Sequence, residues 1–239
     1  MTQKSALVIT AHPGDFVWRA GGAIALHARR GDRVKILCLS FGERGESQFA
    51  WKASGVKMED VKAQRKDEAI RAAEVLGAEI EFLDAGDYPL RITPGMLERA
   101  VDIFHESKPA FVLTHALEDP YNFDHPVAAH FAQEARIIAQ AAGHKPDPSR
   151  AYSAPPVFLF EPHQPEQCNF KPNVILNIDE VWEIKRKAFE VLAAQKHLWE
   201  YYTRVALNRG VQGGRNSGRP FTYGEAYQRL FPEALEVLA

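Results

Sequence analysis

Two clusters of histidine and aspartate in the sequence have the residue types that bind divalent metals. Each follows a short apolar run: residues 11–15 (AHPGD) come first and residues 119–125 (DPYNFDH) much later. Histidine nitrogen and aspartate oxygen are suitable zinc ligands, and three protein ligands plus a water are typical of a catalytic zinc site. We therefore predict a divalent-metal site formed by His12, Asp15 and His125. Zinc is the expected metal, with iron(II), cobalt(II) and manganese(II) as alternatives, because His and Asp bind all of these ions.

The polar residues near these ligands each have two interpretations. The carboxylate of Asp124 could orient a ligating imidazole or hydrogen-bond to metal-bound water, and the alternative is a helix N-cap. His130 is five residues from His125 and would face elsewhere on a helix. We therefore expect structural roles for His130 and for His115.

The loop at residues 41–47 (FGERGES) offers carboxylates that could accept a proton from water. Zinc lowers the pKa of a coordinated water to about 7, so a nucleophile would be available near neutral pH. Either Glu43 or Glu46 could position this water, and we prefer Glu46 because the glycine before it lets the backbone approach the site. The alternative is a solvated charged loop.

Further along the chain, one histidine and three arginines could act on an anionic substrate. His163 follows a predicted strand at residues 157–160 and could protonate a carbanion or enolate, since its pKa is near neutral pH; a plain loop histidine is the alternative. Arg44, Arg215 and Arg219 lie in glycine-rich stretches and could bind substrate carboxylates through paired hydrogen bonds. Arginines are also common on surfaces without a function.

Alternating strands and helices are expected to position these residues. Apolar runs predict strands at residues 5–10, 33–40, 79–83, 111–114 and 157–160. Apolar residues at helical spacing predict helices at residues 18–30, 59–76 and 94–107. This alternation is typical of an α/β fold, and we expect a single Rossmann-like domain over residues 1–239, with helices on both faces of a mostly parallel sheet.

Sheets of this kind bind ligands beyond the carboxyl ends of their strands. The long irregular stretches at residues 41–57, 114–124 and 160–172 all follow predicted strands, so we expect them to converge on one mouth. The first strand is not followed by the G-x-G-x-x-G phosphate cradle, which disfavours a dinucleotide site. Near the end of the chain, residues 179–209 are predicted to be helical, residues 210–219 (GVQGGRNSGR) to be a basic loop, and a short helix to follow.

Composition excludes several classes of function. The net charge of −2 argues against a nucleic-acid-binding surface, which needs clustered Lys and Arg. The two cysteines cannot form a disulfide framework, and no apolar run approaches the length of a membrane span or a signal peptide. We expect a soluble cytoplasmic protein with no membrane partner, and the aromatic C-terminal third makes a homo-oligomer plausible.

The two clusters resemble the signatures of the PIG-L or LmbE-like metal-dependent deacetylases, AHPDD after the first strand and HPDH later. The resemblance extends over residues 65–77, 179–195 and 223–227. It implies that the metal ligands are His12, Asp15 and His125, which agrees with the prediction from residue types.

Two departures from the family pattern change the expected chemistry. The general base of the deacetylases falls on Gly14, which can accept no proton, and the first histidine of their second motif falls on Asn122, which cannot act as a general acid. Residues 11–19, 41–47 and 161–164 (EPHQ) resemble the hydratase branch of this family, where a small residue likewise replaces the base. That resemblance implies water addition across the conjugated double bond of 4-oxalomesaconate, with Asn122 among the substrate-binding residues.

The expected mechanism combines these residues. Glu46 orients water or takes its proton, His163 delivers a proton to carbon, and arginines hold the carboxylates of a small polycarboxylate substrate. Two neutral histidines, one aspartate and a divalent ion are net positive, which favours an anion. One alternative is an amide or N-acetyl-sugar deacetylase in which Glu46 replaces the missing base, and another is a metal- or carbohydrate-binding relic without activity.

Overall fold

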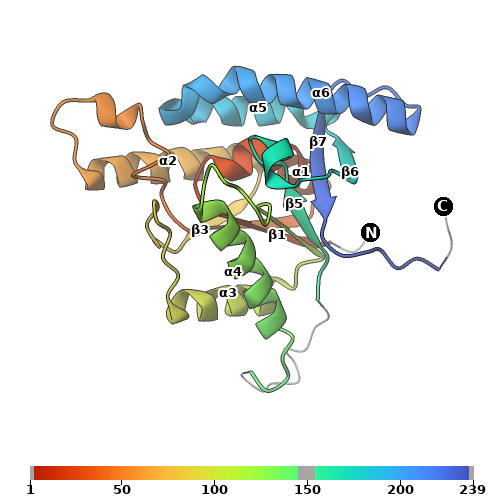
Figure 1. The fold of residues 1–239 in the computed structure, drawn as a ribbon, viewed down its shortest axis with the longest axis horizontal. Coiled ribbons are helices and arrows are strands. Elements are labelled where there is room, and N and C mark those ends of the chain that lie inside the picture. Colours follow the sequence, from red (N-terminus) through yellow and green to blue (C-terminus); the bar gives the residue numbers. More distant parts are fainter. Residues whose placement is uncertain (1–2, 145–153, 237–239) are drawn as a thin grey trace.

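The computed structural model describes residues 3–144 and 154–236 (Figure 1). Within these residues seven strands form one sheet in the order β3-β2-β1-β4-β5-β7-β6. The strands are β1 (Ser5–Thr10), β2 (Arg33–Cys38), β3 (Glu79–Phe82), β4 (Phe111–Thr114), β5 (Val157–Phe160), β6 (Val174–Asn177) and β7 (Gly224–Arg229). The helices are α1 (Asp15–Arg29), α2 (Met58–Leu76), α3 (Pro94–Ser107), α4 (Asp124–Ile138), α5 (Trp182–Val191) and α6 (Trp199–Ser217), with short 3-10 turns that include η5 (Ala193–Leu198).

The first five strands are parallel, and the apolar runs predicted all five. β1 pairs with β2 on one side and with β4 on the other, so that Val8 lies opposite both Ile36 and Leu113. β3 extends the sheet beyond β2, and β5 extends it beyond β4. The chain therefore switches direction across the sheet between β1 and β4, and parallel sheets bind ligands beyond the strand ends at such a switch.

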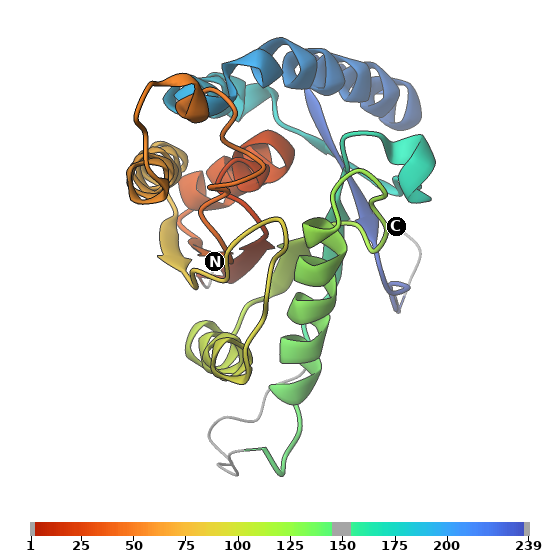
Figure 2. The same ribbon diagram turned by 60° about the vertical axis from the view of Figure 1, so that its left-hand side comes forward.

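The side chains of β1 alternate between two hydrophobic clusters. Ala6 and Val8 belong to a cluster that includes residues of α1, α2, α5 and α6, whereas Leu7 and Ile9 belong to one that includes residues of α3 and α4. Figures 1 and 2 show the same two groups of helices apart from one another. Because neighbouring strand residues point to opposite sides and both sides are buried, the four central residues of β1 (ALVI) are all apolar.

The prediction of a basic, glycine-rich loop at residues 210–219 is wrong, because α6 continues as far as Ser217. Gly210 lies inside this helix at a place where the backbone comes close to the segment that leads into β7. A Cβ atom on Gly210 would lie 2.0 Å from the carbonyl oxygen of Thr222. Glycine here permits close packing of a helix, so its presence did not mark a loop. The helical stretch expected at residues 179–209 is also interrupted, at η5, where Gln195 has a non-helical backbone.

The predicted closing helix is wrong as well, since that part of the chain forms β7. β7 is antiparallel to β5 on one side and to β6, which the sequence did not predict, on the other. β7 contains a buried carboxylate, that of Glu225, which accepts hydrogen bonds from the backbone N–H of Gly22 (2.6 Å) and Ala23 (2.8 Å) and from Nζ of Lys185 (2.6 Å). A buried charge interrupts the apolar pattern by which strands are identified. In the described part of the chain, no helix has the length and apolar character needed to cross a membrane.

Candidate active site

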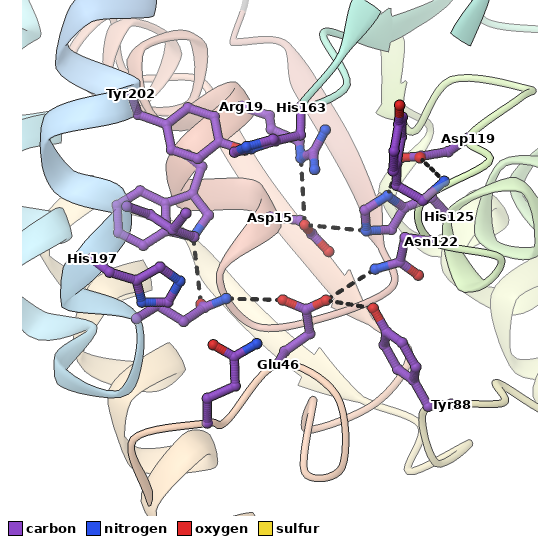
Figure 3. A pocket seen from close by; sticks show the side chains of 15 residues that line it. Asp15, Arg19, Glu46, Tyr88, Asp119, Asn122, His125, His163, His197 and Tyr202 are labelled. Carbon is purple, nitrogen blue, oxygen red and sulfur yellow. Dashed lines mark hydrogen bonds and ion pairs between the residues drawn. The ribbon is translucent and has the colours of Figure 1, made fainter. Parts of the chain in front are cut away.

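The predicted metal ligands come together beyond the carboxyl ends of β1 and β4. His12 follows β1, Asp15 begins α1, and His125 lies in the first turn of α4. One possible ligand atom from each of the three lies within 4.8 Å of the others, and all three residues are buried. Figure 3 shows Asp15 and His125 facing each other across the site.

The hydrogen bonds of His125 leave one of its nitrogens for a metal. Nδ1 lies 2.8 Å from Oδ2 of Asp119, while Nε2 lies 3.5 Å from Oδ1 of Asp15. Nε2 is buried and has no hydrogen-bond partner among the described residues. A carboxylate that binds one ring nitrogen and leaves the other free is typical of metal-ligating histidines. The residues present therefore fit a divalent ion.

His12 lies between two carboxylates. Its Nε2 is 3.2 Å from Oδ2 of Asp124 and its Nδ1 is 3.1 Å from Oδ2 of Asp15. Burial alone would lower the pKa of His12, but the hydrogen bonds with Asp124 and Asp15 outweigh it and raise the pKa to about 10. The two carboxylates thus favour a positive charge beside them, and their negative charge would also attract a metal cation.

Asp124 connects His12 to the loop after β3. Its carboxylate also accepts hydrogen bonds from the backbone N–H groups of Tyr88 and Leu90, both at 2.8 Å. The N-cap of α4 is Phe123, without a side-chain cap. The carboxylate of Asp124 therefore contacts His12, a candidate ligand, as expected if it orients a ligating imidazole. It does not cap α4, which was the alternative.

His115 is buried beside the candidate ligands. Its Nε2 accepts a hydrogen bond from the N–H of Ala11 (3.0 Å), and its ring stacks on His125 with the centroids 4.2 Å apart. Burial, followed by the charge of His125, holds the pKa of His115 well below its ordinary value. A neutral ring with its Nε2 engaged by the backbone agrees with the expected structural role. His130 is exposed on α4.

A pocket lies beside the candidate ligands, and all three irregular stretches contribute to its lining, which confirms their predicted convergence. They supply Glu46 and Gln48, then Asp119, Tyr121 and Asn122, and finally His163. The rest of the lining comes from α1, from His125, from Tyr88 in the loop after β3, and from the region of η5 and α6 that includes Gln195 and Tyr202.

Glu46 is held in this pocket by three neutral donors. Oε1 accepts hydrogen bonds from the hydroxyl of Tyr88 (3.1 Å) and from Nδ2 of Asn122 (2.9 Å), and Oε2 accepts one from Nε2 of Gln195 (3.0 Å). Figure 3 shows dashed lines from Glu46 to Asn122 and to Tyr88, which lie on the same side of it. Glu43, the other carboxylate of this loop, does not line the pocket; it is buried, and burial raises its pKa. Of the two, Glu46 is the one placed to meet a substrate.

Asn122 has both ends of its amide engaged. Its Oδ1 accepts a hydrogen bond from the N–H of Asp124 at 3.1 Å, which leaves Nδ2 directed at Glu46. Asn122 lines the pocket, as a substrate-binding residue must, and it also supports Glu46.

His163 lines the pocket opposite Glu46 and packs against Tyr201, with the ring centroids 4.0 Å apart. The hydroxyl of Tyr201 donates to the backbone carbonyl of His163. Burial, and then the positive charge of Arg19, lower the pKa of His163. The imidazole is therefore neutral near pH 7.

The three predicted arginines do not line the pocket. Arg44 directs its guanidinium at the carbonyl oxygen of Asp87 (2.7 Å), and Arg215 and Arg219 are exposed at the far end of α6. Among the described residues, Arg19 is the one arginine or lysine in the lining.

Arg19 was missed by the sequence analysis. It is buried, with Nε 3.4 Å from Oδ1 of Asp15 and Nη1 donating to the carbonyl oxygen of Glu161 at 2.9 Å. The predicted helix at residues 18–30 begins too late to include Asp15; α1 begins at Asp15 itself, which places Arg19 four residues on and on the same helix face. Asp119, also missed, lies within the second cluster, whereas nothing in the sequence pointed to Tyr88 or Gln195.

Comparisons with known proteins identify the family of this chain. The family profile described as GlcNAc-PI de-N-acetylase, PIG-L, matches residues 7–136, which include all three candidate ligands. The chain is 55% identical over 241 aligned positions to the 4-oxalmesaconate hydratase of Pseudomonas putida KT2440, covering 99% of this chain and 93% of that protein.

Two solved structures are similar to this chain over most of its length. The crystal structure of the 4-carboxy-2-hydroxymuconate hydratase from Pseudomonas putida KT2440 superposes with a TM-score of 0.96 at 55% identity, covering 99% of this chain and 100% of the other. The N,N'-diacetylchitobiose deacetylase from Pyrococcus horikoshii shares the fold, with a TM-score of 0.77 at 24% identity over 95% of this chain and 84% of the other. With the signature residues, the profile match and the full-length relative in agreement, the chain belongs to the PIG-L family.

Proposed function

We propose that the protein is a metal-dependent hydratase that adds water across the conjugated carbon–carbon double bond of 4-oxalomesaconate, also called 4-carboxy-2-hydroxymuconate. The product would be 4-carboxy-4-hydroxy-2-oxoadipate, an intermediate of gallate and protocatechuate breakdown. The observation that carries the proposal is that the carboxylate of the deacetylases at position 14 is absent, while another carboxylate, Glu46, lies in the pocket. Position 14, where the deacetylases have their base, is glycine, while Glu46 is held in the pocket by three hydrogen-bond donors. The relatives that are 55% identical bear hydratase names, which supports it.

The candidate ligands and Glu46 suit the first half of such a reaction. A divalent ion held by His12, Asp15 and His125, with zinc as the proposed ion, would supply Lewis acidity that makes water easier to deprotonate near neutral pH. Asp124 and Asp119 would orient His12 and His125. Glu46 is placed to take the proton of the water whose oxygen adds to the alkene, and its three donors fix the carboxylate for that task.

The second half requires a proton at the neighbouring carbon. His163 lies across the pocket and is the proposed donor. Because its imidazole is neutral near pH 7, the ring has to gain a proton before it protonates carbon. Tyr201, stacked on the ring, limits the orientations that the imidazole can take.

Arg19 is the residue best placed to bind a carboxylate of the substrate. Arg19 lines the pocket, and its buried Nε makes no hydrogen bond within the described residues, although it lies 3.4 Å from Oδ1 of Asp15. Paired hydrogen bonds between guanidinium and carboxylate are among the strongest polar contacts. We propose a small polycarboxylate as substrate, with Arg19 in the role first assigned to Arg44, Arg215 and Arg219.

The alternative, hydrolysis of an N-acetyl group with Glu46 as base, would use the same ligands. The named deacetylase with this fold motivates it. It predicts acetate release from N-acetylated amino sugars and no dependence on a conjugated oxo-acid.

A spectrophotometric assay with 4-oxalomesaconate, before and after chelation, tests the proposal. We expect loss of the conjugated absorbance with wild-type protein, its abolition by chelator, and recovery when metal is returned. Glu46→Gln should lower kcat by about 10²–10⁴-fold, which is the usual contribution of a general base. Glu43→Gln, from the same loop but outside the pocket, is the matched control. Unchanged turnover by metal-loaded Glu46→Gln would remove Glu46 from the mechanism, and absorbance that never changes would reject the hydratase.

The remaining parts of the proposal concern the whole chain. We propose one Rossmann-like domain with helices flanking both faces of the sheet, supported by the two clusters into which β1 side chains divide. We also propose a cytoplasmic homo-oligomer, and light scattering of the purified protein would give its mass in solution.

A further inference from the structure

We propose that Gln195 is a positioning residue that holds Glu46 in its working orientation, and that it can do so only because position 14 is glycine. The proposal rests on the hydratase function above and adds to it a determinant of reaction type. Gln195 lies in η5, far along the chain from both residues.

The amide of Gln195 has a defined orientation. Its Oε1 accepts hydrogen bonds from Nη2 of Arg65 (2.9 Å) and from Nε1 of Trp18 (3.4 Å), both of which are donors only. The NH2 group must therefore face the other way, toward Oε2 of Glu46 at 3.0 Å. The side chain acts as a link between the buried end of Arg65 and the carboxylate in the pocket.

The far end of this link is rigid. Arg65 has no exposed surface, and its Nη1 donates to Oε2 of Glu68 at 2.6 Å. Oε1 of Glu68 in turn accepts a hydrogen bond from the N–H of Ala194, the residue before Gln195. The buried pair of Arg65 and Glu68 in α2 therefore holds both the backbone at Ala194 and the amide oxygen of Gln195. With its oxygen held, the amide nitrogen of Gln195 is fixed toward Glu46.

Glycine at position 14 leaves the space that the amide of Gln195 fills. A Cβ atom on Gly14 would lie 2.1 Å from Oε1 of Gln195 and 2.6 Å from Nε1 of Trp18. Neither distance is compatible with non-bonded atoms, so even alanine would displace the amide. A carboxylate at position 14, as in the deacetylase signature, and a glutamine at position 195 in this orientation exclude each other. With glycine at position 14 and glutamine at position 195, Glu46 is therefore the carboxylate that can act as the base.

The first test, Gln195→Glu, separates positioning from structural support. The substituted side chain keeps the shape of glutamine and would pair with Arg65, but it replaces the donor to Glu46 by a carboxylate that repels it. We expect Gln195→Glu to lower kcat about tenfold or more, the usual effect of losing a hydrogen bond to a charged group, with KM little changed. Gln140→Glu, at an exposed residue after α4, is the charge-matched control and should retain wild-type activity.

The same substitution in a Glu46→Gln background shows whether the effect passes through Glu46. In the double variant the amide introduced at position 46 can donate to the carboxylate introduced at position 195, so we expect no further loss of kcat. A purely structural Gln195 would instead give the same fractional loss of kcat in both backgrounds. That result overturns the proposal.

A second cycle tests the role of position 14. Gly14→Ala should lower kcat strongly when Gln195 is present and less when position 195 is alanine, where only Trp18 remains in the way. Equal losses in the two backgrounds would show that the two residues do not share this space.

These results stay distinct from the fate of the proposed function. If wild-type protein does not hydrate 4-oxalomesaconate, the hydratase is rejected, and melting temperatures still measure the link. Gln195→Glu should then lower the melting temperature more in the wild-type background, where the two carboxylates repel each other, than in the Glu46→Gln background. Identical shifts in melting temperature would overturn the positioning role.

Discussion

Asp119 offers a direct test of how this chain would hold a metal. Its Oδ2 lies 2.8 Å from Nδ1 of His125, and the residue is 5% exposed. Burial opposes ionisation of Asp119, but the hydrogen bond and the charge of His125 outweigh it and lower the pKa. A carboxylate that is ionised at neutral pH holds the proton on Nδ1 and leaves the lone pair of Nε2 directed toward Asp15.

We expect Asp119→Ala to weaken metal binding by about 10–100-fold, the usual cost of losing a residue that orients a ligating histidine. At about 1.4 kcal/mol per factor of ten, this corresponds to about 1.4–2.8 kcal/mol. That range overlaps with the value of about 1.5–3 kcal/mol for a hydrogen bond to a charged group. Asp119→Asn should fall between alanine and wild type, because its carbonyl can accept the Nδ1 proton but lacks the charge.

The assay is competition between the protein and a chromophoric chelator for zinc or cobalt(II), which reads metal affinity without reference to turnover. Asp67→Asn is a suitable control, since Asp67 is an exposed residue of α2 that pairs with Arg71, away from the pocket. Equal affinity in wild type and Asp119→Ala, in a protein whose His125→Ala variant has lost the metal, would refute the reasoning.

Three further predictions follow from the pocket. Gly14→Asp should reduce hydration and produce no acetate release from N-acetylglucosamine, because its side chain collides with Gln195; measurable deacetylation would contradict this. Arg19→Lys should raise KM for the polycarboxylate about tenfold with metal content unchanged, as steady-state kinetics and metal analysis would show, and an unaltered KM would exclude the carboxylate contact. The folded protein should lose stability as pH falls below about 6.5, because there the unfolded chain protonates His115 and the folded chain, whose pKa for this residue is lowered, does not. Melting curves with chelator between pH 7 and pH 5 should therefore show a weaker acid dependence in His115→Gln than in wild type, and parallel curves would count against this explanation.

The sequence predicted those parts of the fold in which burial is uniform along an element. β1 is apolar on both sides because both of its sides are covered. The ligand clusters stand out because they place histidine and aspartate in the segments that follow such apolar runs. His12, Asp15 and His125 were predicted as ligands for this reason, and they lie together in the structure. The same reasoning failed at β7, where Glu225 is buried with its own donors, and at α6, where Gly210 serves helix packing.

The residues that complete the pocket depend on contacts that no local pattern encodes. Gln195 meets Glu46 across 149 residues of sequence, and Tyr88 meets it across 42. Arg215 and Arg219 were predicted because they lie in glycine-rich sequence, although the arginine in the pocket, Arg19, comes from the second turn of α1. Because the predicted helix began only at residue 18, the shared helix face of Arg19 and Asp15 was not apparent.

The carboxylate of Glu225 has a consequence for the modularity of the protein. It receives hydrogen bonds from the backbone of α1, from Lys185 in α5 and from the hydroxyl of Tyr227, so the last strand is fastened to the helix that begins with Asp15. A fragment cut after the profile match would retain every candidate ligand, yet it would expose the side of α1 that packs on β7 and remove the carboxylate that accepts hydrogen bonds from two of its backbone N–H groups. Trimming, circular permutation or fusion designs should therefore preserve β7. We therefore expect residues 7–136, the unit of sequence similarity, to be smaller than the unit that folds.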